Sequence, residues 1–303
     1  MNNVYELIII GAGPAGITAS IYAARKKMNF VVITKDIGGQ TILSSSIENY
    51  TGYQFITGVE LVQKFKEHIE SFNILVKENE PVISVKKEKD IIIIETTKEK
   101  YYTKTVVIAS GRVPRKLNVK GEEEFKNRGV TYCATCDGPL FSGKDVAVIG
   151  GGNSALDAVL QLIKIAKKVY LIDIAKQLRA DPIMVEKAKN SEIVKIYNST
   201  KVLEIYGTNF VEGIKIIQND KIENLSVEGI FIEIGSLPAS DFIRDVAKNE
   251  TGEIIVNCKC ETNISGIFAA GDVTNVPSKQ VIVACGEGAK AALSAFEYLS
   301  RRR

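Results

Sequence analysis

Short apolar runs and helical periodicities alternate along the chain, and this alternation predicts an α/β protein. The apolar run over residues 4–10 predicts a buried strand, and apolar residues at Ile17, Ile21 and Ala24 predict a helix directly after it. The same order of strand, turn and helix recurs over residues 145–163. Further strands are predicted at residues 31–34, 82–85, 91–96, 105–109, 168–172, 194–197, 201–205, 213–218 and 229–233, and further helices at about residues 59–71 and within residues 267–299.

Both of these strand–helix turns are rich in glycine. They read Gly11-x-Gly13-x-x-Gly16 and Gly150-x-Gly152-x-x-Ala155. In such a turn the first glycine allows the tight bend, the second lets the backbone approach a pyrophosphate, and the third position brings the helix close to the strand. One copy could be an ordinary turn between a strand and a helix. Two copies in the same setting predict two dinucleotide-binding sites.

The segment TYCATCDGPLF, residues 131–141, is the candidate for chemistry. The chain has five cysteines and one histidine: Cys133, Cys136, Cys258, Cys260, Cys285 and His68. A structural zinc site needs four Cys or His ligands, and the spacing of Cys258 and Cys260 favours a strand over a metal site. A structural staple is disfavoured, because so small a closed loop restricts the unfolded chain very little. A dithiol that handles electrons remains, since a helix start stabilises a thiolate.

The other cysteines and the histidine have ordinary structural explanations. We expect Cys258, Cys260 and Cys285 to be strand or core residues, because free cysteine packs as a small hydrophobe. We expect His68 to be a half-buried packing residue of the helix over residues 59–71.

Charge and hydropathy exclude several functional classes. The net charge of +3 comes from the arginines at positions 301–303, without which 36 basic residues face 36 acidic ones. So balanced a chain carries no electrostatic footprint for nucleic acid. The first apolar run is too short for a membrane span or a signal segment. We therefore expect a cytoplasmic protein that binds neither nucleic acid nor membrane, and the cysteines and histidine predict no metal site.

An acidic residue follows the predicted strand near the C-terminus. Asp272, in the segment FAAGD, is well placed to hold a polyol hydroxyl such as the ribityl chain of FAD, although it could equally cap a turn. Two dinucleotide sites and a dithiol together indicate flavin in one site and a nicotinamide in the other.

These motifs make the chain resemble the low-molecular-weight thioredoxin reductases. It is equally similar to the C-terminal flavoprotein part of the alkyl hydroperoxide reductase flavoprotein component. The resemblance runs from about Tyr5 to the C-terminus. It rests on GAGPAG, GGQ (38–40), IENYTG (47–52), CATCDGPLF, GGGNSA, CETN (260–263) and FAAGD.

The resemblance implies two Rossmann-like FAD/NAD(P)-binding domains of three-layer ββα type, the second inserted in the first. It implies an FAD domain over residues 1–112 and 246–303, a nicotinamide-nucleotide domain over residues 113–245 that carries the dithiol, crossovers near residues 112–114 and 243–247, and a homodimer. The implied cofactor-binding residues of the first domain are Gly11, Gly13, Pro14, Ala15, Gly16, Gly38, Gly39, Gln40, Asn49, Val82, Ala109, Gly111, Gly271, Asp272, Lys279, Gln280 and Val281. Those of the second are Gly150, Gly152, Asn153, Ser154, Ala155, Asp173 and Arg179.

The resemblance also implies the chemistry. Two electrons pass from a nicotinamide to FAD and then to the Cys133–Cys136 disulfide, with Cys136 facing the flavin, Cys133 attacking the partner and Asp137 carrying the proton. The partner would be the disulfide of a thioredoxin- or glutaredoxin-like protein. A ferredoxin-type donor, a flavoprotein oxidase that reduces oxygen, and a zinc-binding scaffold remain as alternatives.

Two departures from the family pattern bear on partner and donor. The peroxide-reductase relatives typically carry Pro-His between the cysteines and an N-terminal thioredoxin-like double domain. Here CATC stands in the loop and the first glycine turn begins within ten residues of the start, so we expect electrons to leave to a separate protein. NADPH-using relatives typically place His-Arg-Arg after the second strand, where this chain has Asp173-Ile174-Ala175 and keeps only Arg179. The acid predicts NADH.

Overall fold

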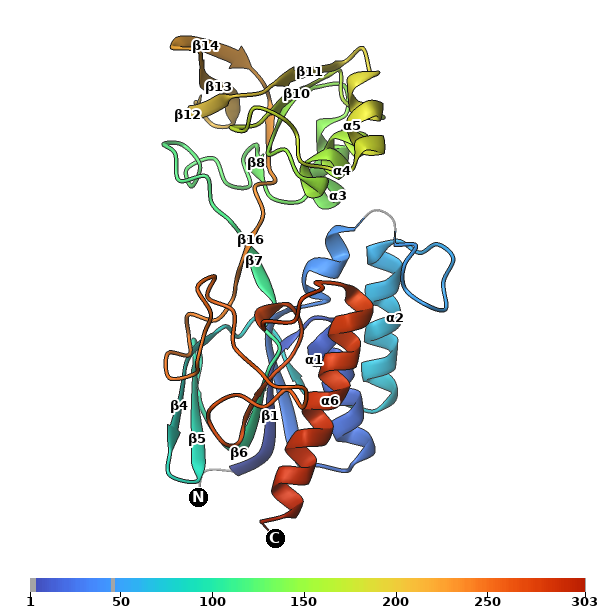
Figure 1. Ribbon diagram of the computed structural model, residues 1–303, viewed down its shortest axis with the longest axis vertical. Helices are drawn as coiled ribbons and strands as arrows, with labels where there is room; N and C mark the ends of the chain where they lie inside the picture. Colours follow the sequence, from blue (N-terminus) through green and yellow to red (C-terminus); the bar gives the residue numbers. More distant parts are fainter. Residues whose placement is uncertain (1–3, 45–46, 303) are drawn as a thin grey trace. The chain divides into compact units, whose positions relative to one another are not determined.

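The chain folds into two units, which the computed structural model describes over residues 4–44 and 47–302 (Figure 1). Unit 1 comprises Met1–Val113 and Leu237–Arg303, and unit 2 is the continuous segment Pro114–Ser236. The second crossover therefore follows Ser236, and the expectation of a crossover near residues 243–247 is wrong. Ile243 and Val246 are buried in the core of unit 1, which holds this segment there.

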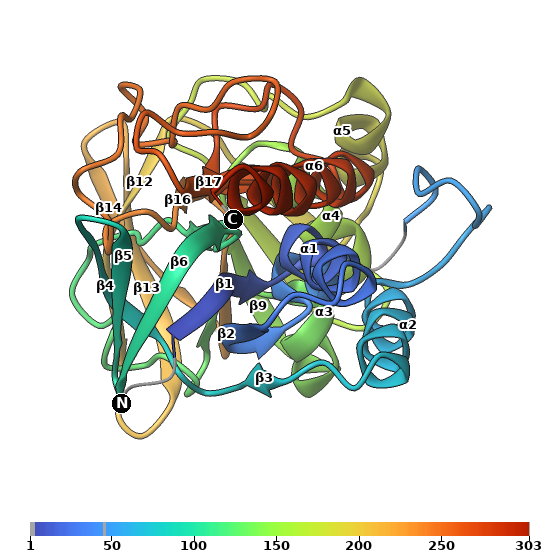
Figure 2. The same cartoon turned by 90° about the horizontal axis from the view of Figure 1, so that it is seen from below.

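Unit 1 is built around a largely parallel sheet. Its strands run in the order β3-β2-β1-β6, with β17 beside the end of β6 and the antiparallel β4–β5 hairpin joined to the start of β6. Figure 2 shows this succession and places α1 beside α6. The elements are β1 (Val4–Ala12), α1 (Pro14–Arg25), β2 (Phe30–Ile37), α2 (Gly58–Ser71), β3 (Val76–Lys77), β4 (Val82–Glu88), β5 (Ile91–Thr96), β6 (Lys100–Ile108), β17 (Ile267–Ala269) and α6 (Val281–Ser300), with 3₁₀ turns at Gly39–Leu43 and Gly271–Val273.

Alternation along β1 gives unit 1 its three layers. Leu7 and Ile9 belong to the core cluster that contains the alanines of α1 and α6, whereas Ile8 and Ile10 belong to the cluster that contains β4, β5 and β6. Successive side chains of a strand point to opposite faces, so a run that is apolar at every position is buried on both sides. The helices therefore cover one face of the sheet, and the β4–β5 hairpin packs on the other together with buried residues of the segment 243–254.

The contact between α1 and α6 depends on one glycine. A Cβ added to Gly288 would lie 2.0 Å from the carbonyl oxygen of Ala15, whereas a Cβ added to Gly286, two residues earlier in the same helix, meets nothing within 4 Å. We expect Gly288→Ala to lower the free energy of unfolding by about 1–3 kcal/mol through overpacking. Gly286→Ala should raise it by up to ~1 kcal/mol through helix propensity. Denaturant unfolding of both variants measures this difference, and two shifts of the same sign would contradict it.

Unit 2 repeats the architecture of unit 1. A parallel sheet of order β11-β10-β9-β15-β8 lies between two core clusters, one with the helices and one with the antiparallel sheet β12-β13-β14. Its elements are β8 (Val130–Thr131), α3 (Ala134–Asp137), β9 (Asp145–Ile149), α4 (Asn153–Leu162), β10 (Lys168–Ile172), α5 (Pro182–Lys189), β11 (Val194–Tyr197), β12 (Thr200–Gly207), β13 (Val211–Gln218), β14 (Lys221–Ser226) and β15 (Gly229–Ile232), with a 3₁₀ turn at Gly138–Phe141. Short strands β7 (Arg112–Pro114) and β16 (Ser236–Pro238) pair at the two crossovers.

The predicted α/β class with two three-layer Rossmann-like units is confirmed, and two local expectations are wrong. Neither Cys258 nor Cys260 lies in a strand, because the Asn257 side chain accepts hydrogen bonds from the backbone N–H groups of Lys259 and Glu261. Cys258 is exposed, so the expectation that it is a strand or core residue is wrong. Cys260 is nevertheless in the core, where burial, with Glu287 beside it, raises its thiol pKa to about 12. His68 is exposed, since Ile69 takes the buried position on α2.

Among the helices of residues 4–44 and 47–302, none is both long and apolar enough to cross a membrane.

Candidate functional site

The first glycine turn of unit 1 is a backbone cradle at the start of α1. A Cβ on Gly11 would lie 2.4 Å from the carbonyl oxygen of Ala109, and a Cβ on Gly16 would lie 1.9 Å from that of Gly11. Both positions therefore require glycine. Gly13, the residue that caps α1, has nothing within 4 Å of its Cβ position. This open space at a helix N-terminus can receive a phosphate.

The second glycine turn has the same construction in unit 2. A Cβ on Gly150 would lie 2.2 Å from the carbonyl oxygen of Glu233, and Ala155 packs against the turn. Gly152 caps α4 and again has open space at its Cβ position. Asn153 exchanges hydrogen bonds with Asp181 across 2.8 and 3.3 Å, which fixes the first turn of the helix. The two glycine turns thus share one geometry, one turn in each unit, and each leaves open space at a helix N-terminus that suits a phosphate.

Asp173 lies beside the second glycine turn, and one of its two carboxylate oxygens has no hydrogen-bond partner. It follows β10, its side chain is 4% exposed, and its buried Oδ2 has no hydrogen-bond partner. Residue 151 must be glycine for Asp173 to keep this position, because a Cβ on Gly151 would lie 2.0 Å from Oδ2. Arg179 lies at the rim, with Nη2 3.8 Å from Asp173 Oδ1 and its backbone N–H bonded to the carbonyl of Gly151. A buried acceptor without a donor fits a ligand hydroxyl.

The expected FAD residues of unit 1 come together from distant parts of the chain. A Cβ on Gly39 would lie 3.3 Å from Gly13 Cα, and one on Gly271 would lie 2.9 Å from Ala15 Cβ. The Asn49 side chain donates to Gln280 across 3.0 Å. Pro14 is the first residue of α1, Gly38 precedes the 3₁₀ turn that holds Gln40, Gly111 precedes β7, and Val281 is the first residue of α6. Val82 begins β4 and packs against the core on the β4–β6 side.

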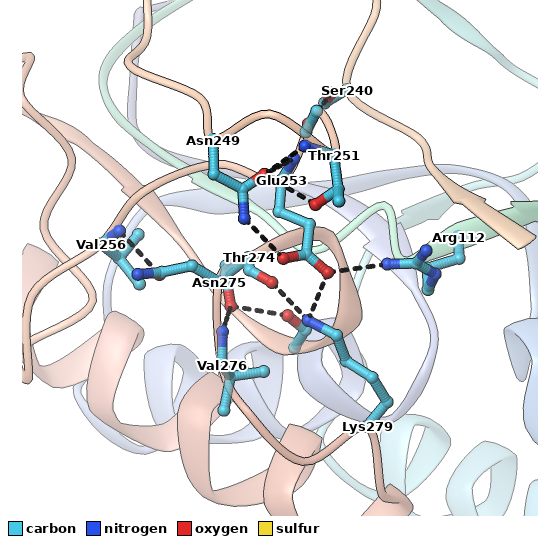
Figure 3. Close-up of polar contacts among 12 residues, drawn as sticks. Arg112, Ser240, Asn249, Thr251, Glu253, Val256, Thr274, Asn275, Val276 and Lys279 are labelled. Carbon is cyan, nitrogen blue, oxygen red and sulfur yellow. Dashed lines mark hydrogen bonds and ion pairs between the residues drawn. The ribbon is translucent and has the colours of Figure 1, made fainter.

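The Glu253 carboxylate holds two cationic side chains and an asparagine side chain (Figure 3). Arg112 Nη1 and Lys279 Nζ both lie 3.0 Å from Glu253 Oε1, and Asn249 Nδ2 donates to Oε2 across 2.8 Å. Burial acts to raise the pKa of Glu253, but the Asn249 hydrogen bond and the two cations outweigh it and lower the pKa. Burial raises the pKa of Asp272, against the opposing influence of Lys279 and Arg112. Lys279 is therefore held in place before any ligand binds.

The candidate dithiol is a disulfide at the start of a helical turn in unit 2. Cys133 and Cys136 are bonded, with Cα atoms 5.4 Å apart. Cys133 caps α3, and its Sγ accepts the N–H of Cys136 at 2.9 Å. Asp137, half-buried, ends the turn and accepts a hydrogen bond from the Thr131 hydroxyl. Among residues 4–44 and 47–302, no group of three or more His, Cys, Asp or Glu side chains is arranged to hold a metal ion.

Two titratable side chains, Glu233 and Asp157, lie close to the glycine turn of unit 2. Burial, with the Asp157 carboxyl nearby, raises the pKa of Glu233 to about 8. Asp157 is held by Gln161, whose Oε1 in turn accepts the hydroxyl of Thr135 in the dithiol loop. Sequence reasoning missed Thr131, Glu233 and Glu253. Thr131 is the first residue of the segment TYCATCDGPLF, although the sequence offered no reason to assign it a role, whereas Glu233 and Glu253 belong to no motif.

Comparisons with known proteins agree with this geometry. A sequence profile of the family described as pyridine nucleotide-disulphide oxidoreductase matches residues 5–288. An alkyl hydroperoxide reductase component of Escherichia coli strain K12 is 38% identical over 313 residues, covering 99% of this chain and 59% of the relative. A protein named NADH dehydrogenase from Ferdinandcohnia aciditolerans is 38% identical over 301 residues, covering 98% and 58%. The chain thus spans about three fifths of the length of these curated relatives.

Among solved structures, the thioredoxin reductase of Lactococcus lactis in its FR conformation matches with a TM-score of 0.89. The two chains are 35% identical, and the match covers 98% of this chain and 99% of that one. Family profile and structural match both extend over nearly the whole chain. The chain therefore belongs to the pyridine nucleotide-disulphide oxidoreductase family and has the fold of the thioredoxin reductases.

Proposed function

We propose that the protein is an FAD-dependent reductase that passes electrons from NADH, through FAD and the Cys133–Cys136 pair, to the disulfide of a small thioredoxin- or glutaredoxin-like protein. The observation that carries the proposal is the Cys133–Cys136 disulfide. It lies in the same unit as the second glycine turn and as Asp173, whose buried Oδ2 has no hydrogen-bond partner. We also propose a cytoplasmic homodimer, in line with the resemblance.

Unit 1 is the proposed FAD domain and unit 2 the proposed nicotinamide-nucleotide domain. The open position at Gly13 would receive the FAD pyrophosphate at the N-terminus of α1. Asp272 would accept a ribityl hydroxyl, with Lys279 fixed beside it by Glu253. FAD, when bound, supplies a centre that takes two electrons from a nicotinamide and gives them to a disulfide.

The dithiol performs the exchange with the protein partner. The Cys133 thiolate attacks one sulfur of the partner's disulfide, so a Cys133–partner bond forms and the other partner sulfur leaves as a thiolate that takes up a proton. Cys136 then attacks Cys133, which restores the internal disulfide and releases the second partner sulfur. Asp137 is the proposed proton carrier, because it lies on the same helical turn as both cysteines.

The donor is proposed to be NADH because of Asp173. Its buried, unpartnered Oδ2 is suited to the ribose hydroxyls of NADH. A 2′-phosphate about 4 Å away would be repelled by roughly 4 kcal/mol per charge at a near-surface dielectric, before screening. Arg179 is 70% exposed and can offset only part of this. The relative named NADH dehydrogenase supports the same donor.

We therefore expect kcat/KM for NADH to exceed that for NADPH by at least about tenfold, once Arg179 and salt have reduced the repulsion. Anaerobic stopped-flow reduction of the bound flavin with each nucleotide measures this directly. Asp173→Asn should reduce the ratio of kcat/KM for NADH to that for NADPH, and Asp220→Asn, at an exposed turn between β13 and β14 of the same unit, is the control. Equal or faster reduction by NADPH would refute the assignment, and failure of both nucleotides would indicate a ferredoxin-type donor.

The acceptor is tested by comparing two reactions of the same enzyme. Anaerobic turnover with NADH and a thioredoxin-like disulfide protein should exceed oxygen consumption with NADH alone. An enzyme that consumes oxygen rapidly and leaves protein disulfides intact is an oxidase, and the proposal then fails.

A further inference from the structure

The side chain of Thr131 connects the two chemical groups of the dithiol loop. Thr131 ends β8, pairs with Phe231 of β15 and is 7% exposed. Its hydroxyl oxygen accepts the backbone N–H of Cys133 at 3.2 Å, and the hydroxyl proton is donated to Asp137 Oδ2. One buried hydroxyl thus contacts both the backbone of a redox cysteine and the carboxylate of the proposed proton carrier.

The backbone of the loop reinforces this connection. The N–H of Asp137 donates to the carbonyl oxygen of Cys133 at 3.1 Å. Asp137 is therefore tied to Cys133 by its own backbone and, through Thr131, by its side chain. The neighbouring Tyr132 points elsewhere, since its hydroxyl donates to Glu122 Oε1 at 2.7 Å. Thr131 and Tyr132, neighbours in sequence, therefore face different partners, and of these two it is Thr131 that contacts the dithiol loop.

We propose that Thr131 is a positioning residue that holds the Asp137 carboxyl group beside the dithiol for proton transfer. This inference rests on the proposed function. When two electrons from the reduced flavin break the Cys133–Cys136 bond, the two sulfurs become one thiolate and one thiol, and the protonated Asp137 carboxyl group gives its proton to the thiol and becomes a carboxylate. When the dithiol reduces a partner disulfide, the Asp137 carboxylate takes that proton back. A carboxyl group that rotates freely about the Cα–Cβ and Cβ–Cγ bonds would transfer the proton more slowly.

Electron transfer from the reduced flavin to the Cys133–Cys136 disulfide can be measured without the electron donor and without the protein partner, so it tests the role of Thr131 separately from both. Anaerobic reduction of the bound flavin by light or dithionite, followed by its reoxidation by the disulfide, needs neither NADH nor a protein acceptor. Thr131→Val keeps the β-branched shape and removes the hydroxyl, and we expect it to slow this step about tenfold, the effect of losing one hydrogen bond to a charged group. Thr131→Ser should stay within about twofold of the original rate, because it restores the hydroxyl. Flavin content and flavin reduction by NADH should not change.

Two comparisons make the inference falsifiable. If Thr131 acts through Asp137, then Thr131→Val should not lower the rate of the half-reaction further in a protein that already carries Asp137→Asn. If the two residues act independently, the two rate reductions should multiply. Thr105→Val is the matched control, since this threonine is fully buried in a strand and its hydroxyl donates to the carbonyl of Glu6. An unchanged half-reaction in Thr131→Val, failure of serine to rescue, or multiplicative losses would each overturn the inference. A wild-type protein that transfers electrons to its disulfide but reduces no protein partner would refute the proposed function alone.

Discussion

Cys133→Ser is expected to abolish reduction of a protein disulfide, while the bound flavin is still reduced by NADH. The serine hydroxyl is neither a thiolate at neutral pH nor able to form a mixed disulfide, so electrons reach the flavin and stop there. Turnover with a thioredoxin-like acceptor and anaerobic flavin bleaching measure the two halves separately. Cys258→Ser, at an exposed free cysteine, is the matched control and should keep full activity.

The companion variant assigns the separate roles of the two cysteines. Cys136 is exposed and Cys133 half-buried in the disulfide state, so exposure alone does not identify the attacking sulfur. With Cys136→Ser, an attacking Cys133 should remain trapped in a mixed disulfide with the partner, visible as a covalent complex that reductant dissolves. A trapped complex with Cys133→Ser instead would reverse the roles, and near wild-type turnover in either variant would refute the dithiol mechanism.

Asp137→Asn is expected to lower kcat for protein disulfide reduction by ~10²-fold, the low end of a general acid–base contribution. Reduction of the disulfide leaves one thiolate and one thiol, so one proton must be delivered, and the amide cannot carry it. FAD content should not change, because Asp137 belongs to unit 2 and the proposed FAD residues to unit 1. Asp241→Asn, at an exposed position, is the control. A variant with full kcat near neutral pH would mean that water supplies the proton and that Asp137 is structural.

The fold could be predicted from the sequence where burial is complete. Residues 7–10 are apolar at every position because both faces of β1 are covered, and the same holds for β9 and β10. Strand β14 escaped prediction because it is an edge strand: of its six residues only Leu225 is buried, so its sequence shows no apolar alternation. Burial by distant elements, rather than local propensity, decides such segments.

The candidate site also contains residues that could be predicted from the sequence and residues that could not. The glycine turns and the cysteine pair could be predicted because backbone geometry and thiol chemistry accept few residue types at those positions. Glu253 could not, since its role depends on Arg112 and Lys279, which approach it only in the folded chain. His68 was misjudged because helical spacing identifies a face but not which of two neighbours, His68 or Ile69, lies at its edge.

The insertion of unit 2 into unit 1 has a consequence for biosynthesis. The ribosome releases the whole of Pro114–Ser236 before it has made β17 and α6, which unit 1 needs to complete its sheet and to cover α1. Unit 2 is continuous and can fold as soon as it emerges. The N-terminal part of unit 1 cannot complete its core at this stage, because the face of α1 that packs against Gly288 of α6 is still exposed. Unit 2 with its disulfide loop can therefore form before the first glycine turn is enclosed, and α6 is the last element that unit 1 receives from the ribosome.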